Sequence, residues 1–270
     1  KTLFYVQCFI ATIIPIVLSF TQILFPTETT KVLWIFIGYS IFASVTEIIL
    51  DKIITKFKET AASIQELFDC TVLKIQWNTV LIPDKPLPET IYKWYSKYIK
   101  NNSTINLYNW YSTEIEKVDT NLATVICQRT NCVYDFSIRK KYNVGLGLLA
   151  GLTFGVLFLV ATITDITLQK FLTNVLFPSL PIFLLSIKQY FSNRDSIKNL
   201  ASLKSIIGST LSKVSLQATI NQDAIRQIQD KIYNNRILSP LLPDWVFNKF
   251  RDKLEAQMHF AVKDIIEKIE

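Results

Sequence analysis

Residues 144–163 read VGLGLLAGLTFGVLFLVATI, an apolar stretch without a charged residue. Three more apolar stretches are of similar length: Leu3–Phe25, Val32–Leu50 and Phe171–Ile187. A helix rises about 1.5 Å per residue, so stretches of this length match a hydrocarbon core of about 30 Å. The sequence therefore predicts an integral membrane protein dominated by α-helices, with four transmembrane helices arranged as two pairs.

Composition agrees with this class, because half of the residues are hydrophobic and the excess over a soluble protein is concentrated in the four stretches. Such a distribution is untypical of a soluble globular domain. The chain starts at Lys1 and its only methionine is Met258, so we expect a further segment before Lys1.

Positive charge is distributed unevenly along the chain, whose net charge is +7. The loop inside each pair of stretches is neutral, whereas 51–142 and 188–270 each hold 13 lysines and arginines. Basic residues collect on the cytoplasmic side, so both termini and both polar regions are expected in the cytosol. The predicted organisation is 1–50 for membrane helices one and two, 51–142 for a cytosolic region, 143–190 for membrane helices three and four, and 191–270 for cytosolic C-terminal helices.

Glu47 lies near the cytosolic end of the second stretch. An acidic residue at such a depth is a candidate for function, and we consider it for gating. The alternative is a carboxylate that reaches the interface or pairs with Lys52.

Glycines and prolines mark the second pair of stretches. Gly147, Gly151 and Gly155 share one helix face and allow another helix to approach, within one subunit or between subunits. Pro178 and Pro181 remove backbone donors and should bend the fourth helix. A bent helix can act as a gate, although prolines also occur in membrane helices without moving parts.

The polar regions read as mostly helical with a short extended segment. Residues 51–69 predict a helix that leaves the membrane, Cys70–Asn78 an extended piece, and Val118–Tyr142 a long helix that returns. An apolar stripe over 193–236 must bury against another element, and Asp244 is a plausible N-cap for a last amphipathic helix.

Catalytic and metal-binding patterns are missing from the sequence. His259 is the only histidine, and Cys127 and Cys132 lack the second cysteine pair of a zinc site. No glycine-rich phosphate loop or nucleophile elbow is present. We therefore expect no catalytic residues, no metal, no bound cofactor and no enzyme activity.

Aromatic residues occur with arginines in the polar regions, and these types can build a nucleotide pocket because bases stack on rings and arginine binds phosphate. The residues are Trp77, Trp94, Tyr95, Trp110, Tyr111, Arg129, Arg139, Arg226 and Arg236. The alternative is that they are core aromatics and helix-surface ion pairs. The basic surface would also suit anionic lipid headgroups.

Three blocks of sequence resemble a known family. Residues 66–78, ELFDCTVLKIQWN, resemble an "EEFD…VLxLPWN" block of the SMODS-associated four-transmembrane effectors. A second block of the family, "WY…CQRxNxxWDxxLRxxY", resembles four strings here: WY at 110–111, ICQRTN at 126–131, YD at 134–135 and IRKKY at 138–142. A third block, "RxxQDxIYxxR…PDW", resembles RQIQDKIYNNR at 226–236 followed by PDW at 243–245. The chain departs from these patterns at Gln76, where proline is usual, and at Tyr134, where tryptophan is usual.

This resemblance, which covers essentially the whole chain, implies a pore-forming effector of the bacterial anti-phage systems called CBASS. The family's genes lie beside nucleotidyltransferases that make cyclic oligonucleotides. We expect a cyclic di- or trinucleotide to bind the cytosolic part, homo-oligomers to form, and the bacterial inner membrane to be permeabilised in abortive infection. The expected partners include membrane lipids but no DNA or RNA polymer, and a family-typical cytosolic helix is expected before Lys1.

Six residues are the predicted ligand contacts: Trp77, Tyr111, Arg129, Arg139, Arg226 and Arg236. The competing interpretation is that Gln128, Arg129, Asp135 and Arg139 form a buried polar network that holds the cytosolic helices together. Two other functions remain open: a membrane-bound enzyme acting on lipid or nucleotide, and a passive scaffold that binds a partner through its apolar stripes.

Overall fold

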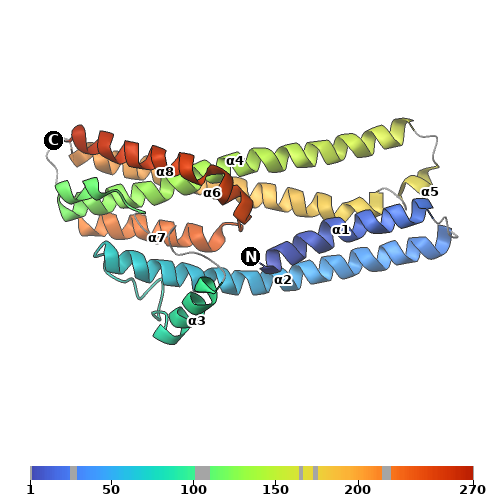
Figure 1. The fold of residues 1–270 in the computed structure, drawn as a ribbon, viewed down its shortest axis with the longest axis horizontal. Coiled ribbons are helices and arrows are strands. Elements are labelled where there is room, and N and C mark those ends of the chain that lie inside the picture. The colour runs from blue at the N-terminus through green and yellow to red at the C-terminus, as the bar shows by residue number, and fades with distance from the viewer. Residues whose placement is uncertain are drawn as a thin grey trace. The chain divides into compact units, whose positions relative to one another are not determined.

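Helices are the regular secondary structure of the residues that the computed structural model describes, which are 2–24, 29–100, 110–163, 167–172, 176–214 and 220–269. The helices are α1 (Thr2–Leu24), α2 (Thr29–Val72), α3 (Pro88–Ile99), the 3-10 helix η2 (Thr113–Lys117), α4 (Thr120–Ile163), α5 (Leu168–Phe171), α6 (Phe177–Val214), α7 (Gln222–Leu238) and α8 (Asp244–Glu267) (Figure 1). No strand occurs in these ranges, so the all-α fold class is confirmed there.

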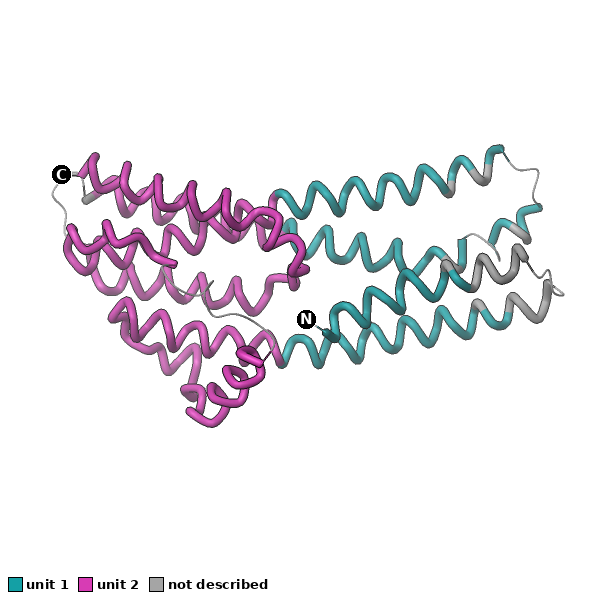
Figure 2. The backbone as a smooth tube through the Cα atoms, in the orientation of Figure 1, with its two compact units in different colours: residues 1–56, 141–194 teal, residues 57–140, 195–270 magenta. Residues whose placement is uncertain are grey.

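The chain divides into two compact units (Figure 2). Unit 1 comprises residues 1–56 and 141–194, and unit 2 comprises residues 57–140 and 195–270. Helices α2, α4 and α6 each contribute residues to both units. The assignment of these segments to membrane and cytosol stays a prediction.

Judged over the described residues, none of the helices combines the length and the apolar character that crossing a membrane requires.

Unit 1 exposes its large apolar side chains and buries polar ones. Trp34 is 71% exposed and Leu152 is 68% exposed, and Phe42, Ile48, Phe154 and Phe158 are exposed as well. In contrast, Gln7 is only 3% exposed. Its amide Nε2 donates to Asp51 Oδ1 at 3.1 Å and so joins α1 to α2.

An ion-pair cluster joins α2 to α6 within unit 1. Lys188 Nζ lies 2.9 Å from Glu47 Oε1 and also pairs with Asp51. The partner of Glu47 is therefore Lys188, and not Lys52 as the sequence alternative proposed. A cavity of about 80 Å³ lies beside this cluster and is lined by Gln7, Ser40, Ser44, Thr46, Glu47 and Pro181, among others.

The glycines of α4 differ in their surroundings. A Cβ atom at Gly147 would lie 3.4 Å from the Tyr190 ring of α6, within unit 1, so this glycine permits a helix contact. A Cβ atom at Gly151 or Gly155 would meet no described atom within 4 Å. Within one copy of the chain, Gly147 is therefore the only one of the three predicted glycines that lies close to a described residue of another helix.

The two prolines of α6 have unequal effects on its backbone. Pro178 lies in the first turn, where helix N–H groups have no intrahelical partner. Pro181 lies one turn further and removes the hydrogen bond to the carbonyl of Phe177. Only Pro181 is therefore placed to weaken the described helix.

The core of unit 2 forms where α2, α4, α6 and α7 meet. Its buried residues include Val125, Leu203, Ile207, Ile225, Ile228 and Ile232, and the last five of these belong to the predicted stripe over 193–236. Cys70, Cys127 and Cys132 belong to this core, and all are free thiols. Burial raises the pKa of Cys127 and of Cys132 to about 12, so both stay protonated at neutral pH.

Several predicted boundaries were wrong. Helix α2 continues to Val72, so the extended piece is confined to the residues after Lys74. The stripe is divided between α6 and α7, because Asn221 caps α7 by accepting from Asp223 N at 3.0 Å. The N-cap of α8 is Pro243 rather than Asp244, and Asp244 is the first residue of the helix.

Candidate functional site

A tight turn at the end of α2 begins the candidate site. Lys74 has a φ of 54°, the left-handed conformation that usually favours glycine. The amide of Ile75 donates to the carbonyl of Cys70 at 3.0 Å, which closes the helix end in the manner of a Schellman motif. This turn reverses the chain and brings the following loop onto the side of α7.

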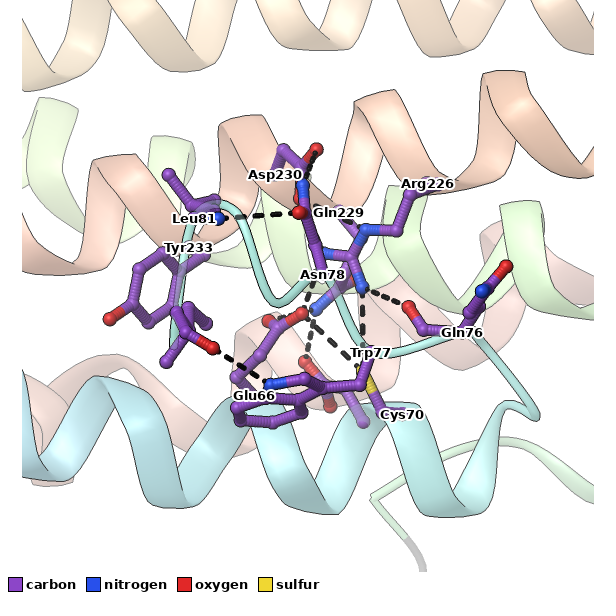
Figure 3. A network of polar contacts seen from close by, with 12 residues as sticks. Glu66, Cys70, Gln76, Trp77, Asn78, Leu81, Arg226, Gln229, Asp230 and Tyr233 are labelled. Atoms are coloured by element: carbon purple, nitrogen blue, oxygen red, sulfur yellow. Dashed lines mark hydrogen bonds and ion pairs between the residues drawn. The ribbon is translucent and has the colours of Figure 1, made fainter. Parts of the chain in front are cut away.

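The loop is fixed by Trp77 and Asn78 (Figure 3). The Asn78 side chain accepts from the amides of Val80 and Leu81 at 3.0 and 3.2 Å, and it donates to Asp230 Oδ2 of α7 at 2.9 Å. Trp77 donates from its indole nitrogen to the carbonyl of Ile82 at 2.9 Å. Both side chains therefore stabilise the loop itself and its contact with α7.

Glu66 of α2 lies at the centre of a buried polar network (Figure 3). Its side chain is only 1% exposed. One carboxylate oxygen lies 2.6 Å from Arg226 Nη2, and the other accepts from Gln229 Nε2 at 2.8 Å. Arg226 also bonds Asp230 and the carbonyl of Gln76, so this guanidinium joins α2, the loop and α7.

Asp69 extends the network by one helical turn. Its Oδ2 accepts from Gln229 at 3.0 Å and lies 2.8 Å from Arg236 Nη2. Gln128 of α4 donates to Gln229 Oε1 at 3.1 Å and to the carbonyl of Ile225 at 3.0 Å. We call the set Glu66, Asp69, Gln128, Arg226, Gln229 and Arg236 the Glu66 network.

Two buried atoms of the Glu66 network have no hydrogen-bond partner among the described residues: Gln128 Oε1 and Arg236 Nη1. Buried polar atoms are usually paired, so each unpaired atom has a free-energy cost. The network is therefore rigidly bonded on the α2 side and incompletely bonded next to α4 and at the C-terminal end of α7.

Electrostatics keeps Arg226 charged within the network. Burial by itself lowers its pKa, but the hydrogen bond and the negative charge of Glu66, together with the charge of Asp230 and the hydrogen bond to Cys70, raise the pKa overall. Tyr111 has a raised pKa because it is buried and because the charge of Asp69 opposes its ionisation. Its hydroxyl accepts from Asn131 Nδ2 at 2.9 Å, so Tyr111 lies beside the network as a neutral phenol.

Arg139 belongs to a separate cluster on α4. It donates to Asp135 Oδ1 at 2.8 Å and to the carbonyl of Pro240 at 3.0 Å. Asn235 of α7 donates to the other oxygen of Asp135 at 3.3 Å. Through the hydrogen bond from Arg139 to Pro240, this cluster holds the start of the segment between α7 and α8 against α4.

Arg129 differs from the other predicted arginines. It is half-buried and makes no hydrogen bond or ion pair with a described residue. Burial lowers its pKa, and the negative charge of Asp264 in α8 opposes this shift only in part. Arg129 is thus a partly desolvated cation that lacks a bonded carboxylate.

The structure brings four of the six predicted residues together: Trp77, Tyr111, Arg226 and Arg236. Arg129 and Arg139 lie apart from them on α4. For Gln128, Asp135 and Arg139, the contacts favour the polar-network interpretation, while Arg129 takes no part in such a network.

Sequence reasoning missed the acidic and amide residues that organise the network, chiefly Glu66, Asp69 and Gln229. A signal was available, because Gln229 falls between Ile225 and Ile232 on the apolar face of α7 and so had to be buried. In the described ranges, no group of three His, Cys, Asp or Glu side chains could hold a metal ion.

The comparisons define the class of this protein. The family model of the SMODS-associating 4TM effector domain matches residues 1–265, so the chain belongs to that family of effector domains. A protein of Bacillus cereus strain VD146, named a probable CBASS effector molecule, is 28% identical over 270 residues, which cover 96% of this chain and 87% of the relative. No solved structure matches the chain. The family resemblance seen in the sequence is confirmed.

Removing the Glu66 carboxylate should strongly destabilise unit 2. The substitution Glu66→Ala leaves Arg226 and Gln229 without their buried acceptor, and we expect a loss of about 3–5 kcal/mol in unfolding free energy. Urea titration of the protein in detergent micelles, followed by tryptophan fluorescence, measures this loss.

Glu59→Ala is the matched control, because Glu59 is an exposed residue of the same helix. Its effect should stay within about 0.5 kcal/mol. The double variant Glu66→Ala/Arg226→Ala should lose less than the sum of the single variants. Equal effects of Glu66→Ala and Glu59→Ala would contradict the central role of Glu66.

Proposed function

We propose that this chain is a membrane effector of bacterial anti-phage defence in a CBASS system. A cyclic di- or trinucleotide binds unit 2, copies of the chain form a homo-oligomer, and the inner membrane is permeabilised. In this proposal the four apolar stretches cross the membrane, and both termini and the polar regions lie in the cytosol. The chain acts without catalysis, and the nucleotide is its activating ligand.

The distribution of side chains in unit 1 is the observation that carries the proposal. Apolar side chains such as Trp34, Phe42 and Leu152 face outward, whereas the polar side chains of Gln7, Ser186 and Asn193 are buried. In water this arrangement would leave a large apolar surface exposed, which soluble monomers avoid. In lipid the same arrangement satisfies polar groups inside the helix bundle, where membrane proteins keep them.

A route from ligand to membrane is supported by the continuity of three helices. Because α2, α4 and α6 contribute residues to both units, a change in unit 2 acts on the same helices that form unit 1. A ligand shifts an equilibrium between closed and open states only through its different affinities for them. Assembly of subunits around the ligand would supply such a difference.

Among the six predicted contacts, Arg129 is the arginine most available to an anionic ligand. Arg139, Arg226 and Arg236 already have bonded carboxylates, so phosphate would have to displace these partners. A cavity near Trp110 and Tyr134 measures only about 10 Å³, which admits a single water molecule at most. We therefore place the nucleotide on a surface that includes Arg129 and is completed by a second subunit.

Leakage from liposomes tests this function. The protein is reconstituted into vesicles that contain a self-quenched dye and is then exposed to a panel of cyclic di- and trinucleotides. We expect dye release with one nucleotide and none without ligand. If no nucleotide binds and none causes leakage, the pore function is wrong. Turnover of lipid or nucleotide without leakage would identify an enzyme instead, and binding of a partner protein alone would identify a scaffold.

Arg129→Ala should weaken the nucleotide response. Loss of a charge-assisted hydrogen bond to phosphate costs about 1.5–3 kcal/mol, so the nucleotide concentration needed for half-maximal release should rise about 10- to 100-fold. Lys198→Ala removes an exposed cation from α6 and should leave this concentration unchanged. An Arg129→Ala protein that is folded and fully responsive would exclude Arg129 from the site.

Leucine at Gly151 and Gly155 should impair assembly without unfolding the monomer. These positions have free space around a Cβ atom in one copy, so a larger side chain clashes only if another subunit packs there. Cross-linking in nucleotide-treated vesicles should yield fewer oligomers than the parent protein gives. Leucine at Gly145, which also has open space, is the control. Unchanged oligomers in the Gly151→Leu/Gly155→Leu protein would show that this face is not the subunit contact.

A further inference from the structure

Two cations from different helices of unit 2 lack carboxylate partners. Arg129 of α4 is half-buried and Lys204 of α6 is exposed, and neither makes a hydrogen bond or an ion pair with another residue that the structure describes. Lys204 instead holds its ammonium group 5.2 Å from the centroid of the Phe136 ring of α4, a cation–π contact. Both cations therefore keep hydrogen-bond donors that an anion can use.

A contact between α4 and α6 relates the positions of these two cations. The Cys132 thiol of α4 donates to the Leu200 carbonyl of α6 at 3.4 Å. Arg129 precedes Cys132 by one helical turn, and Lys204 follows Leu200 by one turn. Because α4 and α6 run in opposite directions (Figure 1), both cations lie on the same side of this contact. Burial is the main cause of the raised pKa of Cys132, and the positive charges of Lys204 and Arg129 oppose the rise.

One carboxylate of α8 opposes this positive charge. Burial lowers the pKa of Arg129, and the charge of Asp264 acts against that shift from beyond ion-pair distance. The ion-pair partner of Asp264 is Lys268, whose Nζ lies 2.7 Å from its Oδ2. Together with Lys204, these groups amount to three cations and one carboxylate, so the local charge is positive. An anion with more than one negative charge complements this balance.

Phosphate groups on one ligand match the two cations. A guanidinium binds phosphate through two parallel N–H donors, whereas an ammonium group binds it as a point charge. Arg129 and Lys204 lie on different helices, so a ligand that uses both needs phosphates at separate positions. A cyclic di- or trinucleotide carries its phosphodiester groups around a closed ring and so meets this requirement. A single inorganic phosphate does not.

We propose that the nucleotide bridges α4 and α6, with one phosphate at Arg129 and another at Lys204, and that Asp264 weakens its binding. The inference rests on the proposed function and assigns Lys204 as a second phosphate contact. Phe136 is a positioning residue, because its ring orients the Lys204 ammonium group. Since α4 and α6 both contribute residues to unit 1, a ligand that bridges them acts on two helices of that unit at once.

Two substitutions with opposite expected effects test this site on the full chain. The measured quantity is the concentration of cyclic di- or trinucleotide that gives half-maximal dye release from phosphatidylcholine vesicles. Lys204→Gln should raise it about tenfold or more, because a charge-assisted contact to phosphate is lost. Asp264→Asn should lower it about threefold, because a nearby negative charge is removed. Lys198→Gln removes another exposed cation of α6 and should leave it unchanged.

Chemical acetylation of lysines tests the same contact without any substitution. The protein in vesicles is treated with an N-hydroxysuccinimide ester of acetate, and the modified lysines are identified by mass spectrometry. The nucleotide that causes leakage should slow acetylation of Lys204 about threefold or more and leave that of Lys198 unchanged. Inorganic phosphate at the same concentration should protect neither lysine. Equal protection of Lys204 by inorganic phosphate would overturn the proposal, because one phosphate would then suffice.

The parent protein separates this inference from the function on which it rests. If a nucleotide causes leakage while Lys204→Gln and Asp264→Asn respond like the parent, the site between α4 and α6 is wrong and the proposed function stands. If no nucleotide binds the parent protein and none causes leakage, both are wrong. A gain in sensitivity from Asp264→Asn cannot come from misfolding, so this variant keeps the test valid even where Lys204→Gln loses its response.

Discussion

The buried carboxylate of Glu66 is the interaction on which unit 2 depends. It holds Arg226 and Gln229 at 2.6 and 2.8 Å, and through them it joins α2, α7, α4 and the loop at Trp77. A buried ion pair is not by itself a large source of stability, because desolvation opposes the attraction between the charges. Its value lies in specificity, since few other arrangements of these helices would satisfy so many buried groups at once. The left-handed turn at Lys74 contributes to the same specificity, because it places the carbonyl of Gln76 within hydrogen-bonding distance of Arg226.

The apolar periodicity of the sequence predicted most of the fold. Residues at helical spacing, such as Ile225, Ile228 and Ile232, are buried where the stripe indicated. Helix ends were less predictable, because Lys74 adopts a conformation typical of glycine, and no propensity points to this lysine. The continuation of α2 to Val72 follows from tertiary contacts that local sequence does not encode, including the hydrogen bond from Thr124 to the Leu73 carbonyl.

The candidate site was predictable in its residue types but not in its pairing. Arginines and aromatics were recognisable from composition and from family-like blocks, and four of the six residues lie together. Arg139 pairs with Asp135 four residues away, but the buried carboxylate partners of Arg226 and Arg236 are Glu66 and Asp69, more than 150 positions away. Pattern and spacing contain no information on such distances. The distinction between a satisfied arginine and the unpaired Arg129 therefore had to come from the three-dimensional structure.

The cluster of Lys188, Glu47 and Asp51 has an unequal charge balance. One ammonium group faces two carboxylates, and the lining of the cavity beside them includes the polar side chains of Ser40, Ser44 and Gln7 among apolar ones. If water replaces the helix contacts there, the excess carboxylate attracts cations and repels anions. Under the proposed function, a lesion that opened along this face would therefore dissipate gradients of sodium and potassium before it released phosphate or nucleotides. Loss of the membrane potential would precede loss of the cell's anionic metabolites.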